Sequence, residues 1–186
     1  MIARKNPFNT EQILKIRYQL QSGTWEELLG RLKQFNYRAA IIGPEGSGKT
    51  TLLEDLQPHL LRYGFIPVYL RLRPEGKLNI SIRELTSSHI LLLDGSESLS
   101  IFTWMRLKLA SHKLGGLIIT AHQPGRLPTL IRCSTNAELL SNIVYSLVES
   151  VSNASKVNCT ECYSKYNGNI REALRAHYDE WATKDD

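Results

Sequence analysis

The stretch Gly43-Pro-Glu-Gly-Ser-Gly-Lys-Thr50 ("GPEGSGKT") matches the pattern G-x-x-x-x-G-K-[S/T]. An apolar segment at 37–43 leads into it, and a helical pattern at 50–64 follows. Glycines let successive backbone N–H groups turn towards one anion, and the positive end of the following helix points at the same place. The stretch therefore predicts a phosphate-binding loop between a strand and a helix.

The chemistry of such a loop assigns a role to each of its residues. Lys49 is expected to reach the β- and γ-phosphates of a nucleotide, where it would be catalytic. Thr50 is expected to provide a hydroxyl ligand to Mg²⁺. The predicted nucleotide-binding set is Gly43, Pro44, Glu45, Gly46, Ser47, Gly48, Lys49, Thr50 and Thr51.

A second apolar segment, 89–94 ("HILLLD"), ends in an acid. A buried parallel strand that ends in an aspartate beside a phosphate loop can hold the metal shell from the other side. We therefore predict that Asp94 joins Thr50 in binding Mg²⁺. The alternative to this metal-binding role is that Asp94 only forms a turn at the end of the strand. The next acid in the chain is Glu97.

The chain alternates between strand and helix patterns, which predicts an α/β fold with three layers and a parallel sheet. The five expected strands are 37–43, 65–72, 89–94, 116–121 and 129–133. We expect an N-terminal helical lead-in at 1–36, a nucleotide-binding core at 37–150 and a small helical lid at 151–186. Within the lead-in, Thr24 and Glu27 predict a capping box, after an earlier helical pattern at 13–20.

Composition restricts the classes of function only loosely. The 186 residues carry a formal charge of +5, with a pI near 9.2 and scattered basic residues. This charge would permit contact with nucleic acid, but no helix-turn-helix or aromatic–basic motif supports it. Three cysteines, including Cys159 and Cys162, favour reduced thiols, and no apolar stretch is long enough to cross a membrane. We expect a cytoplasmic protein that does not bind membranes.

The loop, the strand that ends in Asp94 and a later strand that leads to Thr120 and His122 together resemble the AAA+ and NACHT/STAND group of P-loop ATPases. The resemblance spans about 37–181. It implies a five-stranded parallel sheet of order 5-1-4-3-2, a helical lid, and ATP with Mg²⁺ as the ligands. The guanine-specific Asn-Lys-x-Asp pattern is absent from the sequence, so only the resemblance favours ATP over GTP.

The same resemblance suggests a catalytic base. AAA+ proteins usually carry Asp-Glu at the end of this strand, whereas Gly95 follows Asp94 here. NACHT proteins place acids three and four residues after the aspartate, and Glu97 and Ser98 occupy those positions. Glu97 is therefore the candidate for orienting the attacking water. The alternative is a solvated glutamate that opens the next helix, expected at 98–112.

Two further residues resemble nucleotide sensors. Thr120 stands where a hydroxyl would sense the γ-phosphate, with His122 as an alternative, although either residue could simply cap the strand. Arg171, in the stretch Gly168-Asn-Ile-Arg171, resembles the lid arginine called sensor 2; a surface arginine is the alternative. Arg106, Arg126 and Arg132 lie in plausible regions for an arginine finger, but none stands in a recognisable motif. An oligomer is therefore left open.

These expectations favour a slow Mg²⁺-dependent ATPase that acts as a nucleotide-controlled switch or loader on an unknown protein partner. One alternative is a small-molecule P-loop kinase, in which Asp94 or Glu97 would accept the proton of an acceptor hydroxyl. The other is a nucleotide-dependent interaction module without useful turnover, which the single remaining acid at Glu97 supports.

Overall fold

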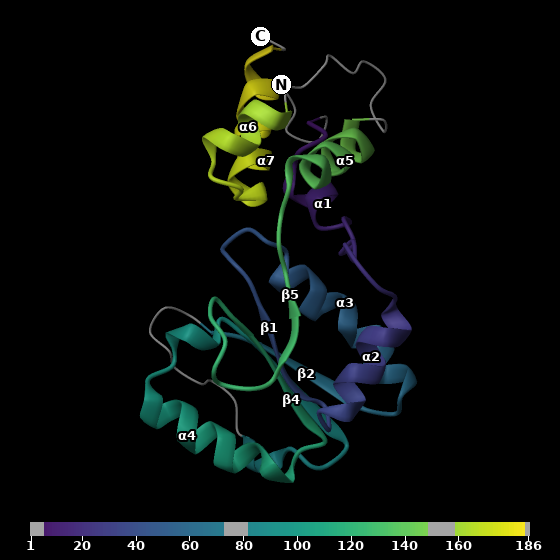
Figure 1. Ribbon diagram of the computed structural model, residues 1–186, viewed down its shortest axis with the longest axis vertical. Coiled ribbons are helices and arrows are strands. Elements are labelled where there is room, and N and C mark those ends of the chain that lie inside the picture. Colours follow the sequence, from purple (N-terminus) through teal and green to yellow (C-terminus); the bar gives the residue numbers. More distant parts are fainter. Residues whose placement is uncertain (1–5, 73–81, 149–158, 185–186) are drawn as a thin grey trace. The chain divides into compact units, whose positions relative to one another are not determined.

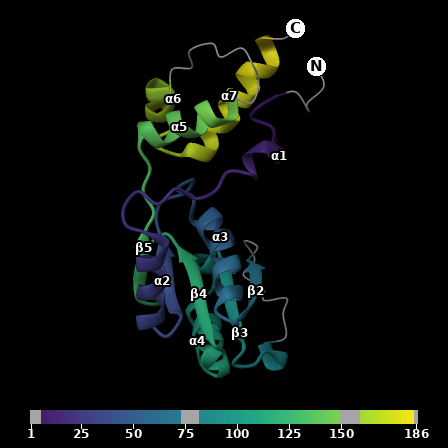
Figure 2. The same cartoon turned by 90° about the vertical axis from the view of Figure 1, so that its right-hand side faces the viewer.

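The computed structural model describes residues 6–72, 82–148 and 159–184 and contains one five-stranded sheet. The strand order is β2-β3-β4-β1-β5, and each neighbouring pair is parallel. Figure 2 shows β5, β4, β3 and β2 side by side in this order. The strands are β1 (Arg38–Ile42), β2 (Ile66–Arg71), β3 (His89–Asp94), β4 (Gly116–Ala121) and β5 (Thr129–Arg132). Read from the other edge, this is the predicted order 5-1-4-3-2.

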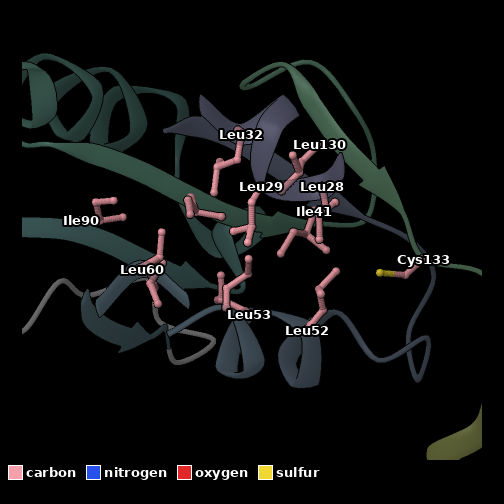
Figure 3. Close-up of a cluster of buried hydrophobic side chains, with 14 residues drawn as sticks. Leu28, Leu29, Leu32, Ile41, Leu52, Leu53, Leu60, Ile90, Leu130 and Cys133 are labelled. Carbon is pink, nitrogen blue, oxygen red and sulfur yellow. The ribbon is translucent and has the colours of Figure 1, made fainter. Parts of the chain in front are cut away.

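Helices cover both faces of the sheet, which confirms the predicted three-layer α/β fold (Figure 1). On one face, α2 and α3 bury leucines against residues such as Ile41, Ile90 and Leu130 (Figure 3). On the other face, α4 packs Trp104 and Leu107 against a second buried cluster. The helices are α1 (Thr10–Ile13), α2 (Trp25–Gln34), α3 (Lys49–Arg62), α4 (Ile101–Ala110), α5 (Ala137–Val148), α6 (Cys159–Lys165) and α7 (Ile170–Lys184).

The central strands are buried on both faces, which explains their nearly continuous apolar sequences. All six residues of β4 are buried, as are the last five of β3. Successive side chains point to opposite faces, so Leu92 joins the cluster under α3 while Leu91 and Leu93 join the cluster under α4. The polar residues that end these strands, Asp94 on β3 and Thr120 near the end of β4, thus lie at the carboxyl edge of a buried sheet.

The contacts divide the chain into two units, and their boundaries differ from the expected division into 1–36, 37–150 and 151–186. One unit, Tyr18–Gly43 with Gly48–Cys133, contains the sheet. The other contains the described residues of Met1–Arg17, Pro44–Ser47 and Ser134–Asp186.

The second unit has a hydrophobic core of its own, which explains the difference. Phe8 is 2% exposed and packs among residues of α5, α6 and α7, including Leu140 and Leu174. Nearby, the Nδ2 of Asn6 donates a hydrogen bond to the carbonyl of Tyr178 at 2.9 Å. The start of the chain thus packs with the C-terminal helices, and the expected boundary at 150 lies outside the described residues.

The helical pattern expected at 13–20 is wrong over most of its length, because α1 ends at Ile13. Tyr18 explains part of the difference. Its N–H donates to the Oδ2 of Asp55 at 2.7 Å, and its side chain packs against the cluster under α3. A tertiary hydrogen bond and burial thus replace the helical hydrogen bonds that the local pattern predicted.

The predicted capping box at the start of α2 is confirmed, and its removal gives a first testable result. The N–H of Glu27 donates to the hydroxyl of Thr24 at 3.2 Å, and the N–H of Thr24 donates to the Glu27 carboxylate at 3.1 Å. We expect Thr24→Ala to lower the free energy of unfolding by about 1 kcal/mol. Urea denaturation measures this loss of unfolding free energy. Thr160→Ala, in the first turn of α6, is the control. Equal effects of the two substitutions would contradict a capping role for Thr24.

Candidate functional site

The phosphate-loop motif lies between β1 and α3, as its sequence predicted. Gly46 and Gly48 adopt positive φ angles of 73° and 82°, a conformation that side chains disfavour. A Cβ added at Gly48 would also lie 3.2 Å from the ring of Tyr18. Gly48 provides no side-chain cap to α3, and the positive end of this helix would attract an anionic ligand.

The lysine of the motif is held inside the loop. Lys49 is only 9% exposed, and its Nζ donates a hydrogen bond to the carbonyl of Gly43 at 2.8 Å. Ser47 similarly donates its hydroxyl to the carbonyl of Pro44 at 2.8 Å. Pro44 and Glu45 are exposed, and Thr51 lies half-buried in the first turn of α3. The loop thus keeps a positive charge close to the backbone that would surround a phosphate.

Three predicted residues meet at the carboxyl edge of the sheet. Thr50, in the first turn of α3, donates its hydroxyl to the two carboxylate oxygens of Asp94 at 3.2 and 3.0 Å. The hydroxyl of Thr120, on β4, donates to Oδ1 of Asp94 at 2.7 Å and accepts the N–H of Gly95 at 2.8 Å. The structure therefore brings together the proposed metal ligands and the proposed sensor threonine.

Two residues that sequence reasoning missed complete this network. Tyr69 and Arg71, both on β2, donate to Oδ2 of Asp94, from the tyrosine hydroxyl at 3.0 Å and the arginine Nε at 3.1 Å. Arg71 is the register partner of Asp94 across the β2–β3 pair. The sequence does carry a signal for these residues, because the strand expected at 65–72 contains Tyr69 and Arg71 near its end. The ends of neighbouring parallel strands lie at one edge of the sheet, so these side chains can reach Asp94.

The hydrogen bonds keep Asp94 ionised. Burial alone would raise the pKa of this carboxyl group, but its four side-chain donors outweigh burial and lower the pKa. Burial and then the charge of Asp94 raise the pKa of Tyr69, so the phenol remains a donor. A charged carboxylate beside a threonine hydroxyl is an oxygen set of the kind that Mg²⁺ prefers, so these residues fit the metal.

Glu97 is placed apart from this network. It lies in a 3₁₀ turn, Ser96–Ser98, and α4 begins only at Ile101, so the helix expected at 98–112 is shorter than predicted. Ser100 caps α4 through the N–H of Thr103, which leaves Glu97 outside the helix. The Glu97 carboxylate lies 3.4 Å from Nε2 of His122, with side chains 38% and 47% exposed. The structure thus pairs the candidate base with the alternative sensor.

The turn that carries Glu97 is fixed by hydrogen bonds. The hydroxyl of Ser96 donates to the carbonyl of Thr120 at 2.7 Å. Arg126 donates to the carbonyls of Ser96 and Leu99, each at 2.7 Å, and its guanidinium lies 5.2 Å from the ring centre of Trp104. Arg126 therefore has a structural role within the chain, whereas Arg106 and Arg132 are exposed.

Arg171 is exposed in the first turn of α7. The preceding residues are ordered by hydrogen bonds: the Asn169 side chain accepts the N–H of Glu172 at 3.2 Å, and Thr135 donates to the carbonyl of Gly168 at 2.8 Å. In the same unit, Asn169 packs directly against Gly46, where an added Cβ would clash with it. Arg171 therefore follows closely after a residue that touches the phosphate-loop motif.

Other candidate features are weaker. Cys159 and Cys162 are free thiols on α6, and within 6–72, 82–148 and 159–184 no group of three or more His, Cys, Asp or Glu residues could hold a metal ion. Among those same residues, no helix has the length and apolar character needed to traverse a bilayer.

Comparisons with known proteins identify the fold. No protein-family model matches the chain, and no curated protein matches it. Among solved structures, a variant of RuvB from Thermotoga maritima is similar at a TM-score of 0.56 and 14% identity over 83% of this chain. NtrX from Brucella abortus is similar at a TM-score of 0.57 and 12% identity over 91% of this chain. The matches span 60% and 52% of those two chains. The chain therefore shares the five-stranded parallel α/β fold of these two proteins.

Proposed function

We propose that this protein binds ATP with Mg²⁺ and hydrolyses it slowly, as a nucleotide-controlled switch or loader of the AAA+ or STAND kind. The observation that carries the proposal is the contact of Thr50 and Thr120 with one ionised carboxylate, Asp94, at the edge where the phosphate loop ends. The two hydroxyls and the acid come from three separate elements, α3, β4 and β3, and they converge where a metal-bound nucleotide would lie.

Each side chain has a distinct role in this proposal. Lys49 would leave the carbonyl of Gly43 and neutralise negative charge that develops on the γ-phosphate. Thr50 and Asp94 would hold Mg²⁺, which supplies further positive charge at the phosphates. Thr120, held by Asp94 and the N–H of Gly95, would act as a sensor through the Asp94 carboxylate, whose position its hydroxyl fixes. The chemistry then consists of positioning and charge stabilisation.

We propose Glu97 as the residue that orients the attacking water, with His122 holding its carboxylate. Glu97 lies on a turn that Ser96 fixes, and its carboxylate is 3.4 Å from the His122 ring. Both contacts support a defined orientation of the Glu97 carboxylate. The exposure of both side chains favours the runner-up, an interaction module that binds nucleotide with little turnover. These two functions differ in one measurable quantity, the rate of phosphate release.

We also propose that Arg171 acts as a lid sensor of the third phosphate. The contact of Asn169 with Gly46 supports this role, since it ties the start of α7 to the phosphate-loop motif. A permanently charged guanidinium that reached a bound nucleotide would report whether a γ-phosphate is present. We further propose that the switch acts on a protein partner in the cytoplasm and that it can form an oligomer.

Phosphate release from purified protein with ATP and Mg²⁺ tests the proposed activity. We expect Glu97→Gln to slow the wild-type rate by about 100-fold with unchanged nucleotide affinity, since general bases contribute at least that much. Glu84→Gln, an exposed glutamate in another 3₁₀ turn, is the matched control and should keep the wild-type rate.

The possible outcomes separate the two functions. Wild-type protein that binds ATP without releasing phosphate would support the interaction module and contradict the ATPase. A Glu97→Gln variant with the wild-type rate would leave the ATPase standing and exclude Glu97 as the base.

A further inference from the structure

Side chains of the protein alone give the carboxylate of Asp94 a full set of donors. Its Oδ2 is approached by the Tyr69 hydroxyl at 3.0 Å, Arg71 Nε at 3.1 Å and the Thr50 hydroxyl at 3.0 Å. Its Oδ1 receives Thr120 and the second, longer contact from Thr50. Each carboxylate oxygen accepts about two hydrogen bonds. A cation that approaches Asp94 must therefore displace one of these donors.

Arg71 is the donor that can leave at the lowest cost. Thr120 is 1% exposed, so its hydroxyl would find no water on leaving Asp94. The side chain of Arg71 is 60% exposed, and its guanidinium would regain water at once. Arg71 also carries the only positive charge among the four donors, so it repels an incoming cation directly.

A second carboxylate lies ready to receive Arg71. The Nη2 of Arg71 is 3.8 Å from the carboxylate of Glu54 on α3. The side chain of Glu54 is 44% exposed. Arg71 thus stands between one acid that is largely buried and one that faces solvent. It can turn towards Glu54 without losing an anionic partner.

We propose that Arg71 is an internal cation that neutralises Asp94 until Mg²⁺ arrives and competes with Mg²⁺ for that carboxylate. This competition raises the Mg²⁺ concentration that is needed to strengthen nucleotide binding. Glu54 weakens the competition, because it holds the guanidinium of Arg71 after Mg²⁺ has displaced it. This inference rests on the proposed binding of ATP with Mg²⁺ and adds a residue that tunes its metal requirement.

Asp94 needs a nearby positive charge because its carboxylate is buried. A carboxylate side chain that is only 10% exposed is costly to keep charged without a nearby cation. Neutral donors such as Tyr69 lower this cost but leave the net charge in place. Arg71 supplies a positive charge 3.1 Å from this carboxylate, which keeps the site preformed.

A Mg²⁺ titration tests the competition. A fluorescent ATP analogue with a methylanthraniloyl group is held at fixed concentration, and its binding to the full chain is followed as Mg²⁺ is added. We expect Arg71→Gln to lower the Mg²⁺ concentration at half-effect by about 3- to 10-fold, in the range of a partly exposed ion pair. Arg62→Gln, which removes an exposed charge from α3, should leave it unchanged.

Glu54 provides a signature that a simple change of net charge would not produce. Glu54→Gln should raise the half-effect concentration, because the displaced Arg71 then loses its second partner. A direct attraction of Glu54 for Mg²⁺ would act in the same direction, so the double variant Arg71→Gln/Glu54→Gln is needed. The effect of Glu54→Gln should disappear in that background. Its persistence would overturn the role of Glu54 as a partner of Arg71.

The result that overturns the proposal is distinct from failure of the proposed function. If wild type binds the analogue and Arg71→Gln leaves its Mg²⁺ dependence unchanged or weakened, Arg71 does not compete with the metal, although nucleotide binding stands. If no variant binds the analogue at any Mg²⁺ concentration, nucleotide binding itself is wrong and the competition fails with it. Circular dichroism spectra of wild type and variants in the absence of Mg²⁺ confirm that the comparison concerns folded protein.

Discussion

Lys49→Ala is expected to reduce the affinity for ATP by about 100-fold or more. Lys49 supplies the only side-chain positive charge of the motif Gly43-Pro-Glu-Gly-Ser-Gly-Lys-Thr50, and charge-assisted hydrogen bonds to phosphate are among the strongest in proteins. The substitution also removes the hydrogen bond from Nζ to the carbonyl of Gly43. Isothermal titration calorimetry with ATP and Mg²⁺ measures the loss.

The control for this prediction removes a lysine elsewhere on the same unit. Lys33 is exposed in the last turn of α2, and Lys33→Ala should bind ATP as wild type does. Circular dichroism of both variants establishes that the helices are intact. Wild-type affinity in folded Lys49→Ala would contradict the assignment of this motif as the phosphate site.

Phe8→Ala is expected to destabilise the helical unit by about 3–5 kcal/mol. Phe8 is 2% exposed, with ring centres 5.5 Å from His177 and 5.9 Å from Trp181. Truncation of a buried phenylalanine removes its apolar contacts and leaves a cavity among α5, α6 and α7. Because the helical unit has a hydrophobic core of its own, hydrogen exchange resolved by peptide is the appropriate measurement.

We expect amides of α5 and α7 to lose protection in Phe8→Ala, while those of β3 and β4 keep it. Phe102→Ala is the matched control, because Phe102 on α4 is 80% exposed and its truncation opens no cavity. Unchanged protection of α5 and α7 in Phe8→Ala would show that the start of the chain contributes little to the helical core.

Much of the sheet-containing unit was predictable because its signals are local. The phosphate-loop motif required a strand before it and a helix after it, and the structure has β1 and α3 at those places. The apolar strand that ends in Asp94 and the capping box of Thr24 and Glu27 also depend on residues close in sequence. The sheet order, in contrast, came from the resemblance to AAA+ and NACHT proteins, since local periodicity says nothing about which strands pair.

The expectations that failed depend on contacts between distant parts of the chain. The segment 13–20 has a helical pattern, but Tyr18 exchanges a local hydrogen bond for one to Asp55. The expected lead-in at 1–36 divides, because Phe8 packs with helices that follow it by more than a hundred residues. Hydrophobic burial acts without regard to sequence separation, so a local pattern cannot reveal its partner.

The sequence by itself determined that the motif with Lys49 and Thr50 follows a strand and opens a helix, and that Asp94 ends a buried strand. Only the tertiary structure decided that Arg71 and Tyr69 share the carboxylate of Asp94, and that Glu97 pairs with His122. The physical reason is the parallel sheet, in which segments far apart in sequence end at one edge. Strand register places Arg71 beside Asp94, and no pattern within either strand specifies that register.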